Sequence, residues 1–282
     1  MKWSKPGSEI YTPDSTSPTE ALSRTTHLAI ASHPDDLEIM AAEGILACFG
    51  RQDQWFTGVV VTDGAGSARD GIYAHFTDEQ MRAIRRREQK KAAVVGEYSA
   101  VIFLDYPSNE VKDAGNLSPI HDLRAVLQAT HPHTVYLHNL ADKHPTHVAT
   151  ALRSIQALRD LPEDVKPSRV VGCEVWRSLD WMEDEDKVVF RLDLHENIAA
   201  ALVALFDSQI TGGKRYDLAT LGRRRANATY FESHSVDAAQ MINFGMDLTP
   251  LIHQPDLSIQ DYVLGYIDRF RASVAANLIK YS

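Results

Sequence analysis

The sequence has few cysteines, no long apolar run and no excess of positive charge. Its two cysteines, Cys48 and Cys173, lie in apolar surroundings, which predicts two small buried side chains and no disulfide framework. No stretch approaches the roughly 18 apolar residues of a membrane-spanning helix, and residues 1–26 lack the apolar segment of a signal peptide. The formal net charge of -9 argues against non-specific binding to nucleic acid or to anionic membranes. We therefore expect a cytoplasmic enzyme or binding protein whose partner is a small molecule.

The composition is that of a globular protein, with 44% hydrophobic and 24% charged residues in 282 positions. A chain of this length can bury a large apolar core. Residues 4–20 are rich in Ser, Thr and Pro, so we predict a loosely ordered N-terminal arm over residues 1–26. No linker divides the remainder. Residues 27–282 are therefore expected to form one α/β domain, in which the part after about residue 180 walls a pocket.

Strand and helix signals alternate along the chain, which predicts a mostly parallel sheet with helices on both faces. Short apolar runs predict strands at 28–31, 56–62, 101–104, 134–138, 169–175 and 188–194. Helical spacing and capping signals predict helices at 37–49, 77–96, 118–130, 148–158, 198–206 and 258–278. The predicted fold is Rossmann-like, with an elaborated C-terminal part.

Two histidine-proline motifs follow two of these strands. His33-Pro34-Asp35-Asp36 comes directly after strand 28–31, and His144-Pro145-Thr146-His147 comes after strand 134–138, with Asp142 between. In a doubly wound sheet of order 3-2-1-4, strands one and four are neighbours and a crevice opens at their carboxyl ends. Two imidazoles and one carboxylate that converge there with an open position make a catalytic metal site. A second carboxylate beside the metal can act as general base for its water.

Each of these features alone also has an ordinary structural role. An aspartate at a strand–helix junction commonly caps the helix, and a single His-Pro pair is commonly part of a loop. Their joint occurrence at two predicted neighbouring strand ends favours the metal site.

Together the two motifs resemble those of the PIG-L/LmbE family, which comprises zinc-dependent N-acetylglucosaminyl deacetylases. The family's first motif reads (A/S)HPDDE, and Ser32 to Asp36 match it, although Leu37 occupies the position of the usual Glu. The second motif reads HPDH, and His144 to His147 match it except at Thr146, where the family usually has Asp. The resemblance spans roughly residues 27–180.

This resemblance implies a set of catalytic roles. His33, Asp36 and His147 would bind zinc, or another divalent metal in its place. Asp35 would be the general base that activates the zinc water. His144 would stabilise the tetrahedral oxyanion and protonate the departing amine, roles that suit the near-neutral pKa of imidazole.

The substrate-binding residues carry a weaker signal. The resemblance places Arg85 on the sugar-bearing side of the pocket. Asp63 can hydrogen-bond a sugar hydroxyl or cap a turn, and Trp176 can stack on a sugar, although a buried core tryptophan is the commoner case. We include Asn109 and Asp142 in the substrate-binding set as well.

The predicted function is removal of an N-acetyl group from an N-acetylglucosamine-type amino sugar or conjugate. Hydrolysis of another small N-acyl amide by the same residues is one alternative. A non-catalytic α/β binding domain and a nucleotide-binding Rossmann protein are two others. The sequence is compatible with a homo-oligomer but does not specify one.

Overall fold

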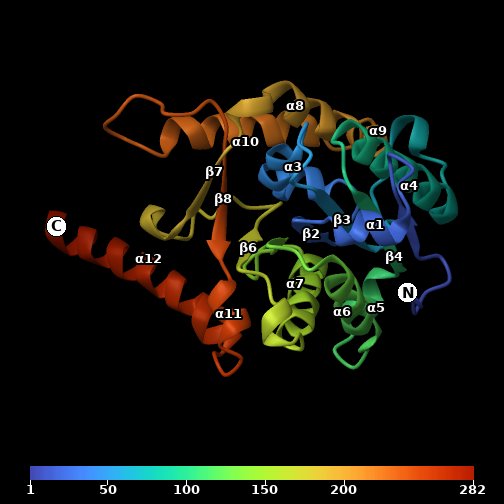
Figure 1. The fold of residues 1–282 in the computed structure, drawn as a ribbon. Coiled ribbons are helices and arrows are strands. Elements are labelled where there is room, and N and C mark those ends of the chain that lie inside the picture. The colour runs from blue at the N-terminus through green and yellow to red at the C-terminus, as the bar shows by residue number, and fades with distance from the viewer.

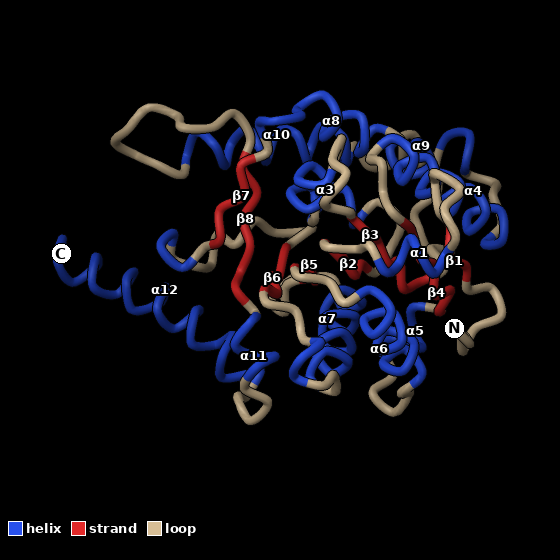
Figure 2. Tube along the Cα trace, in the orientation of Figure 1, coloured by secondary structure: helices blue, strands red, loops and turns tan.

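One mixed sheet with helices on both faces organises the chain in the computed structural model, which describes residues 1–282 (Figures 1 and 2). Across the sheet the strands are β1 (Glu9–Tyr11), β4 (Ala100–Tyr106), β3 (Phe56–Thr62), β2 (His27–Ala31), β5 (Thr134–His138), β6 (Arg169–Cys173), β8 (Ile242–Asp247) and β7 (Val188–Arg191). From β4 to β6 neighbouring strands are parallel, whereas β1, β8 and β7 pair antiparallel. The predicted strands one to four are β2, β3, β4 and β5. Their observed order, β4-β3-β2-β5, confirms the predicted 3-2-1-4 order and the predicted α/β fold.

The helices cover the two faces of the sheet as the alternation of elements predicts (Figure 1). One face carries α1 (Pro18–Ser23), α5 (Ser108–Lys112), α6 (Ser118–Thr130), α7 (Pro145–Arg159) and α11 (Thr249–His253). The other carries α2 (Asp36–Met40), α3 (Ala42–Cys48), α4 (Asp78–Val95), α8 (Glu196–Ala204), α9 (Asp207–Ile210) and α10 (Tyr216–Tyr230). The last helix, α12 (Ile259–Tyr281), runs away from the sheet toward the C-terminus.

Two apolar clusters, one on each face, hold the sheet in place. Leu28 and Ile30 of β2 belong to one cluster, and Ala29 and Ala31 belong to the other. This division follows from the two-residue period of a strand. It also explains why the central strands read as continuous apolar runs, because both of their faces are buried. Cys48 and Cys173 are buried and unpaired, as predicted.

Residues 1–26 are not the loosely ordered arm that their composition predicts. β1 extends the sheet by pairing with β4 through Ile10 and its neighbours. In α1, capped by the side chain of Ser17, Ala21 and Leu22 are buried in the core. The exposed edge of β4 supplies the hydrogen-bond partners that make a strand of three residues. Composition alone does not reveal that contact.

The helix expected after the first motif is divided in two at Ala41, between α2 and α3. The fully buried guanidinium of Arg224 lies at this break and donates hydrogen bonds to the carbonyl oxygens of Glu38 and Ile39. A helix end that is buried needs such donors for its free carbonyl groups.

None of the helices combines the length and apolarity that crossing a membrane requires.

Candidate active site

The candidate site lies at the carboxyl ends of β2 and β5, which are neighbouring parallel strands. The loop after β2 carries the first motif and leads into α2, and the loop after β5 carries the second and leads into α7. A cavity of about 390 Å³ opens there, lined by residues of both motifs. The topology thereby brings together His33 and His147, which are 114 positions apart in the sequence.

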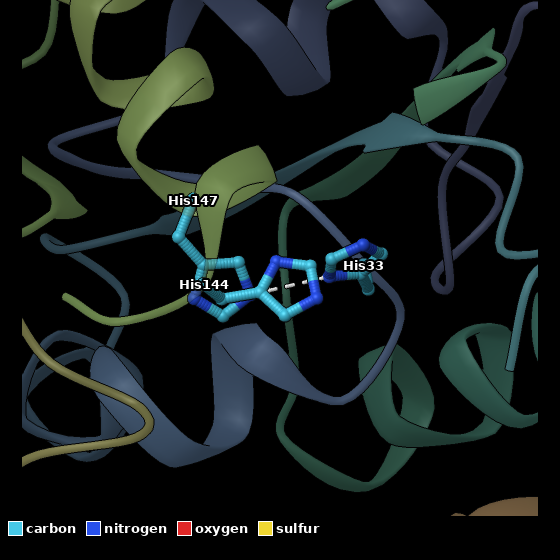
Figure 3. A group of neighbouring side chains, drawn as sticks. All are labelled: His33, His144 and His147. Atoms are coloured by element: carbon cyan, nitrogen blue, oxygen red, sulfur yellow. Dashed lines mark hydrogen bonds between the residues drawn. The ribbon is translucent and has the colours of Figure 1, made fainter. Parts of the chain in front are cut away.

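Three donor atoms from the two motifs converge in this cavity. Figure 3 shows two of the residues, His33 and His147, together with His144, whose donor atom lies within 4.8 Å of theirs. Nδ1 of His33 lies 3.1 Å from Oδ2 of Asp36 and 3.2 Å from Nε2 of His147. Nε2 of His147 lies 3.3 Å from Oδ2 of Asp36. Bonds of about 2.0–2.1 Å to a tetrahedral zinc place ligand atoms about 3.3–3.4 Å apart. The three atoms therefore have the spacing of one face of such a tetrahedron, and the residues fit a zinc ion.

His138 also lies beside this group, and the sequence prediction missed it. Its Nε2 is 3.4 Å from Oδ2 of Asp36, and Asp36, His138 and His147 form a second set of donors within 4.8 Å of one another. However, Nε2 of His138 accepts a hydrogen bond of 2.8 Å from the amide of Ser32, which occupies its lone pair. His33 is thus the better third ligand. The only sequence signal for His138 is a histidine that ends the strand beside β2.

Charge in the group is balanced between the carboxylates and the imidazoles. Burial lowers the pKa of His147, but Asp36 and Asp142 outweigh burial and raise it to about 9. Burial raises the pKa of Asp36, but His147 and the other two imidazoles outweigh it and hold this pKa well below its ordinary value. The carboxylate is therefore ionised at neutral pH, as a metal ligand must be, and a cation that binds here displaces a proton from His147.

Asp142 was predicted to bind substrate, but in the structure it orients His147 instead. Its Oδ2 lies 3.2 Å from Nδ1 of His147 and accepts the amide of Val175 at 3.0 Å. Its other oxygen accepts the amide of His144. The side chain is buried and does not line the cavity. A carboxylate on the far nitrogen of an imidazole fixes which nitrogen faces a metal.

Asp35 lines the cavity beside the three donors. Its backbone has φ 91° and ψ -30°, in the region that favours glycine. Burial raises the pKa of its carboxyl group well above the ordinary value, and Arg85, 3.7 Å away, opposes this shift. The carboxyl group thus lies where it can exchange a proton with a water molecule in the cavity, as a general base must.

His144 lies at the start of α7 and faces the same cavity. Its ring centroid is 5.1 Å from that of His33 and 4.6 Å from that of His147. Burial lowers its pKa to about 4, so the ring is neutral at physiological pH. The half-buried ring of Trp176 stacks beside it at 6.3 Å and also lines the cavity.

The other predicted substrate-binding residues are divided between the cavity and its surroundings. Arg85 lines the cavity, but its guanidinium donates to the carbonyl oxygens of Pro34 and Gly64. Asp63 does not line it: the carboxylate caps the following turn and pairs with Arg82. Asn109 is exposed, and its neighbours Ser108 and Lys112 line the cavity instead. These two are four positions apart on α5, so they share a face that Asn109, about 100° further around the helix, does not.

The part of the chain after residue 180 contributes cavity residues that the sequence prediction did not assign to the site. Gln209, Lys214 and Tyr216 line the cavity, and all three come from α9, α10 or the turn between them. Glu88 fixes α9 to α4 by accepting hydrogen bonds from the amide and the hydroxyl group of Ser208. The hydroxyl group of Tyr73 also donates a hydrogen bond to Asp207 of α9. Such tertiary contacts, rather than a local motif, place the three residues at the site.

Comparison with known proteins agrees with this architecture. The sequence model described as GlcNAc-PI de-N-acetylase, of the PIG-L family, matches residues 28–158. No curated protein matches the chain. Among solved structures, a conserved protein from Thermus thermophilus is similar with a TM-score of 0.62 and 17% identity, over 83% of this chain and 99% of that one.

Two further structures share the fold and differ in their named activities. The N,N'-diacetylchitobiose deacetylase from Pyrococcus horikoshii has a TM-score of 0.62 and 16% identity, over 84% of this chain and 88% of that one. The 4-carboxy-2-hydroxymuconate hydratase from Pseudomonas putida has a TM-score of 0.58 and 17% identity, over 79% of this chain and 96% of that one. At such identities the likeness establishes the fold, and the reaction has to be argued from the site. Residues 28–158 thus match the model of the PIG-L family domain, and the solved structures agree with this chain in fold.

Proposed function

We propose that the protein is a metal-dependent hydrolase that removes the acetyl group from an N-acetylglucosamine-type amino sugar or conjugate. The observation that carries this proposal is the convergence of His33, Asp36 and His147, with donor atoms 3.1 to 3.3 Å apart, beside the carboxyl group of Asp35. The match of residues 28–158 to the GlcNAc-PI de-N-acetylase model supports the same reaction.

The proposed reaction divides its tasks among few residues. A zinc ion held by His33, Asp36 and His147 would polarise the acetamide carbonyl and make a water molecule more acidic. Asp35 takes a proton from the water molecule while the oxygen atom of the water attacks the carbonyl carbon. When the carbon–nitrogen bond breaks, this proton passes to the departing amine, and acetate and a free amine leave.

His144 has two roles in the resemblance, and its environment favours one of them. A neutral ring, kept so by burial, donates a hydrogen bond to the oxyanion. Protonation of the amine by His144 would require a cationic ring, which burial and the neighbouring imidazoles disfavour. We therefore assign the oxyanion to His144 and the proton transfer to Asp35.

The cavity wall supports a sugar substrate. Trp176 presents an aromatic ring there, and the apolar face of a pyranose can pack against such a ring. Lys143 and Lys214 lie 5.6 Å and 5.3 Å from the centroid of the Trp176 ring, and polar groups of Arg85 and Gln209 line the same cavity. A polar cavity lined by the aromatic rings of Trp176 and Tyr216 suits a hydroxylated ring better than an apolar amide.

The test is product analysis with the purified protein, stripped of metal and then loaded with one equivalent of Zn²⁺. N-acetylglucosamine, N,N'-diacetylchitobiose and a panel of acyclic N-acetyl amides are incubated with it, and acetate and free amine are quantified. We expect amine release from the sugars that depends on zinc. Replacement by Asp35→Asn should lower kcat by about 10²- to 10⁴-fold while the zinc content stays at one ion per chain.

Each rival predicts a different result. Hydrolysis of the non-sugar amides alone would show that the protein acts on other small N-acyl amides rather than on amino sugars. A folded protein that binds no zinc and releases no acetate would establish a non-catalytic domain. Full activity in the Asp35→Asn variant would refute the assigned base.

A further inference from the structure

A single peptide unit fixes the strained conformation of Asp35. The positive φ of this residue is set by the orientation of the peptide that joins Pro34 to Asp35. Non-glycine residues rarely adopt such angles, and they keep them only where the surroundings hold the backbone. If this peptide rotated, φ of Asp35 would relax toward ordinary values, and the backbone that carries its carboxylate beside the three metal-binding atoms would shift.

Both polar atoms of this peptide are held by one helix. Nη2 of Arg85 donates a hydrogen bond of 2.8 Å to the oxygen of Pro34. Oε1 of Gln89 accepts a hydrogen bond of 3.2 Å from the amide of Asp35. Arg85 and Gln89 are four positions apart on α4, so they project from the same face, one turn apart. One side chain therefore holds the carbonyl group and the other holds the amide of the same peptide.

The orientation of Gln89 is itself determined by buried partners. Its Nε2 donates a hydrogen bond of 2.6 Å to Oε1 of Glu38, and the same oxygen accepts one of 2.7 Å from the hydroxyl group of Tyr98. Because a backbone amide only donates hydrogen bonds, the oxygen of Gln89 has to face the amide of Asp35, and its amino group therefore faces Glu38. All three side chains are buried, so water does not compete for these bonds.

We propose that Gln89 is a positioning residue, which together with Arg85 clamps the Pro34–Asp35 peptide and thereby holds the Asp35 carboxylate in place for proton transfer. This inference rests on the proposed function, in which Asp35 is the general base. It also gives Arg85 a role different from the sugar contact that the resemblance implies. A displacement of about 1 Å at a reacting group can cost about 100-fold in rate.

The test compares wild type with Gln89→Met, which keeps the volume and helix propensity of the side chain but cannot accept the amide of Asp35. N-acetylglucosamine and N,N'-diacetylchitobiose serve as substrates for the zinc-loaded proteins. We expect kcat to fall about 10- to 100-fold, with KM and zinc content unchanged. Gln156→Met makes the same chemical change at an exposed position of α7 and should leave all three values at wild-type level. Gln89→Asn, which shortens the side chain by one methylene, is a second variant with the same expectation.

A crystal structure of the better-folded variant gives a readout that does not depend on activity. We expect the Pro34–Asp35 peptide to be rotated and φ of Asp35 to be negative. An unchanged peptide, an unchanged kcat in an active background, or a loss of activity that only follows loss of zinc or of folded protein would each overturn the clamp. An inactive wild type would refute the proposed function instead, and the structure of the variant would then decide the clamp alone.

Discussion

A Gly58→Ala substitution should destabilise the protein through α2 rather than through its own strand. An added Cβ at Gly58 would lie 2.5 Å from Cδ1 of Leu37, far inside van der Waals contact. Leu37 is completely buried, so its side chain cannot turn into solvent and has to repack together with α2. Overpacking of this kind costs about 1–3 kcal/mol. Because Leu37 directly follows the proposed ligand Asp36, zinc affinity should fall as well.

Urea unfolding measures the change in free energy, and a second glycine supplies the matched control. Nothing lies within 4 Å of a Cβ built at Gly265 in α12, so Gly265→Ala should stabilise the protein by about 0.5–1 kcal/mol. Leu37→Ala alone should cost about 2–5 kcal/mol by opening a cavity. Since the added methyl group at Gly58 partly fills that cavity, the double variant should be more stable than the sum by about 0.5–3 kcal/mol. Additive effects, or a Gly58→Ala protein as stable as wild type, would refute the packing argument.

Two further predictions concern the cavity wall and the pH dependence of folding. Trp176→Ala should raise KM for N-acetylglucosamine roughly 3- to 10-fold, because it removes a stacking surface; kcat should change less, although the ring also stacks beside His144. An unchanged KM would exclude Trp176 from substrate binding. Burial raises the pKa of Glu174 from 4.5 to about 7, so the folded state binds more protons than the unfolded state in this window. Stability should therefore decrease by up to about 3 kcal/mol as the pH rises through the window, and Glu174→Gln should remove this decrease in urea unfolding. Identical pH dependence in both proteins would contradict the assignment.

The sequence predicted the central elements well because their signals are local. The apolar runs of β3 and β5 were predicted with their observed bounds. The capping box at Thr77 places the start of α4 correctly, with both of its hydrogen bonds present. β1 was not predicted, since Glu9–Tyr11 becomes a strand only by pairing with the edge of β4. Local periodicity reports which face of an element is apolar, but it does not report which distant edge needs a partner.

For the site, the sequence predicted which residues come together but not the direction in which other side chains point. The motifs predicted which residues meet, and His33, Asp36 and His147 do meet in the cavity. The residue types did not predict where Asp63 and Asn109 point, because one position along a helix or turn changes the direction of a side chain completely. Buried partners such as His138 and Gln89 belong to no motif, and only the contacts between elements identify them.

The departure of Thr146 from the family motif illustrates how the fold supplies what a motif lacks. Thr146 is buried, and its carbonyl oxygen accepts a hydrogen bond from the hydroxyl group of Ser32, so it joins the two motif loops through its backbone. The carboxylate that orients His147 comes from Asp142, two positions before His144. Loss of the usual aspartate therefore does not leave the imidazole without a carboxylate partner. For this reason we expect zinc binding to be retained, and the non-catalytic rival loses the observation that most favoured it.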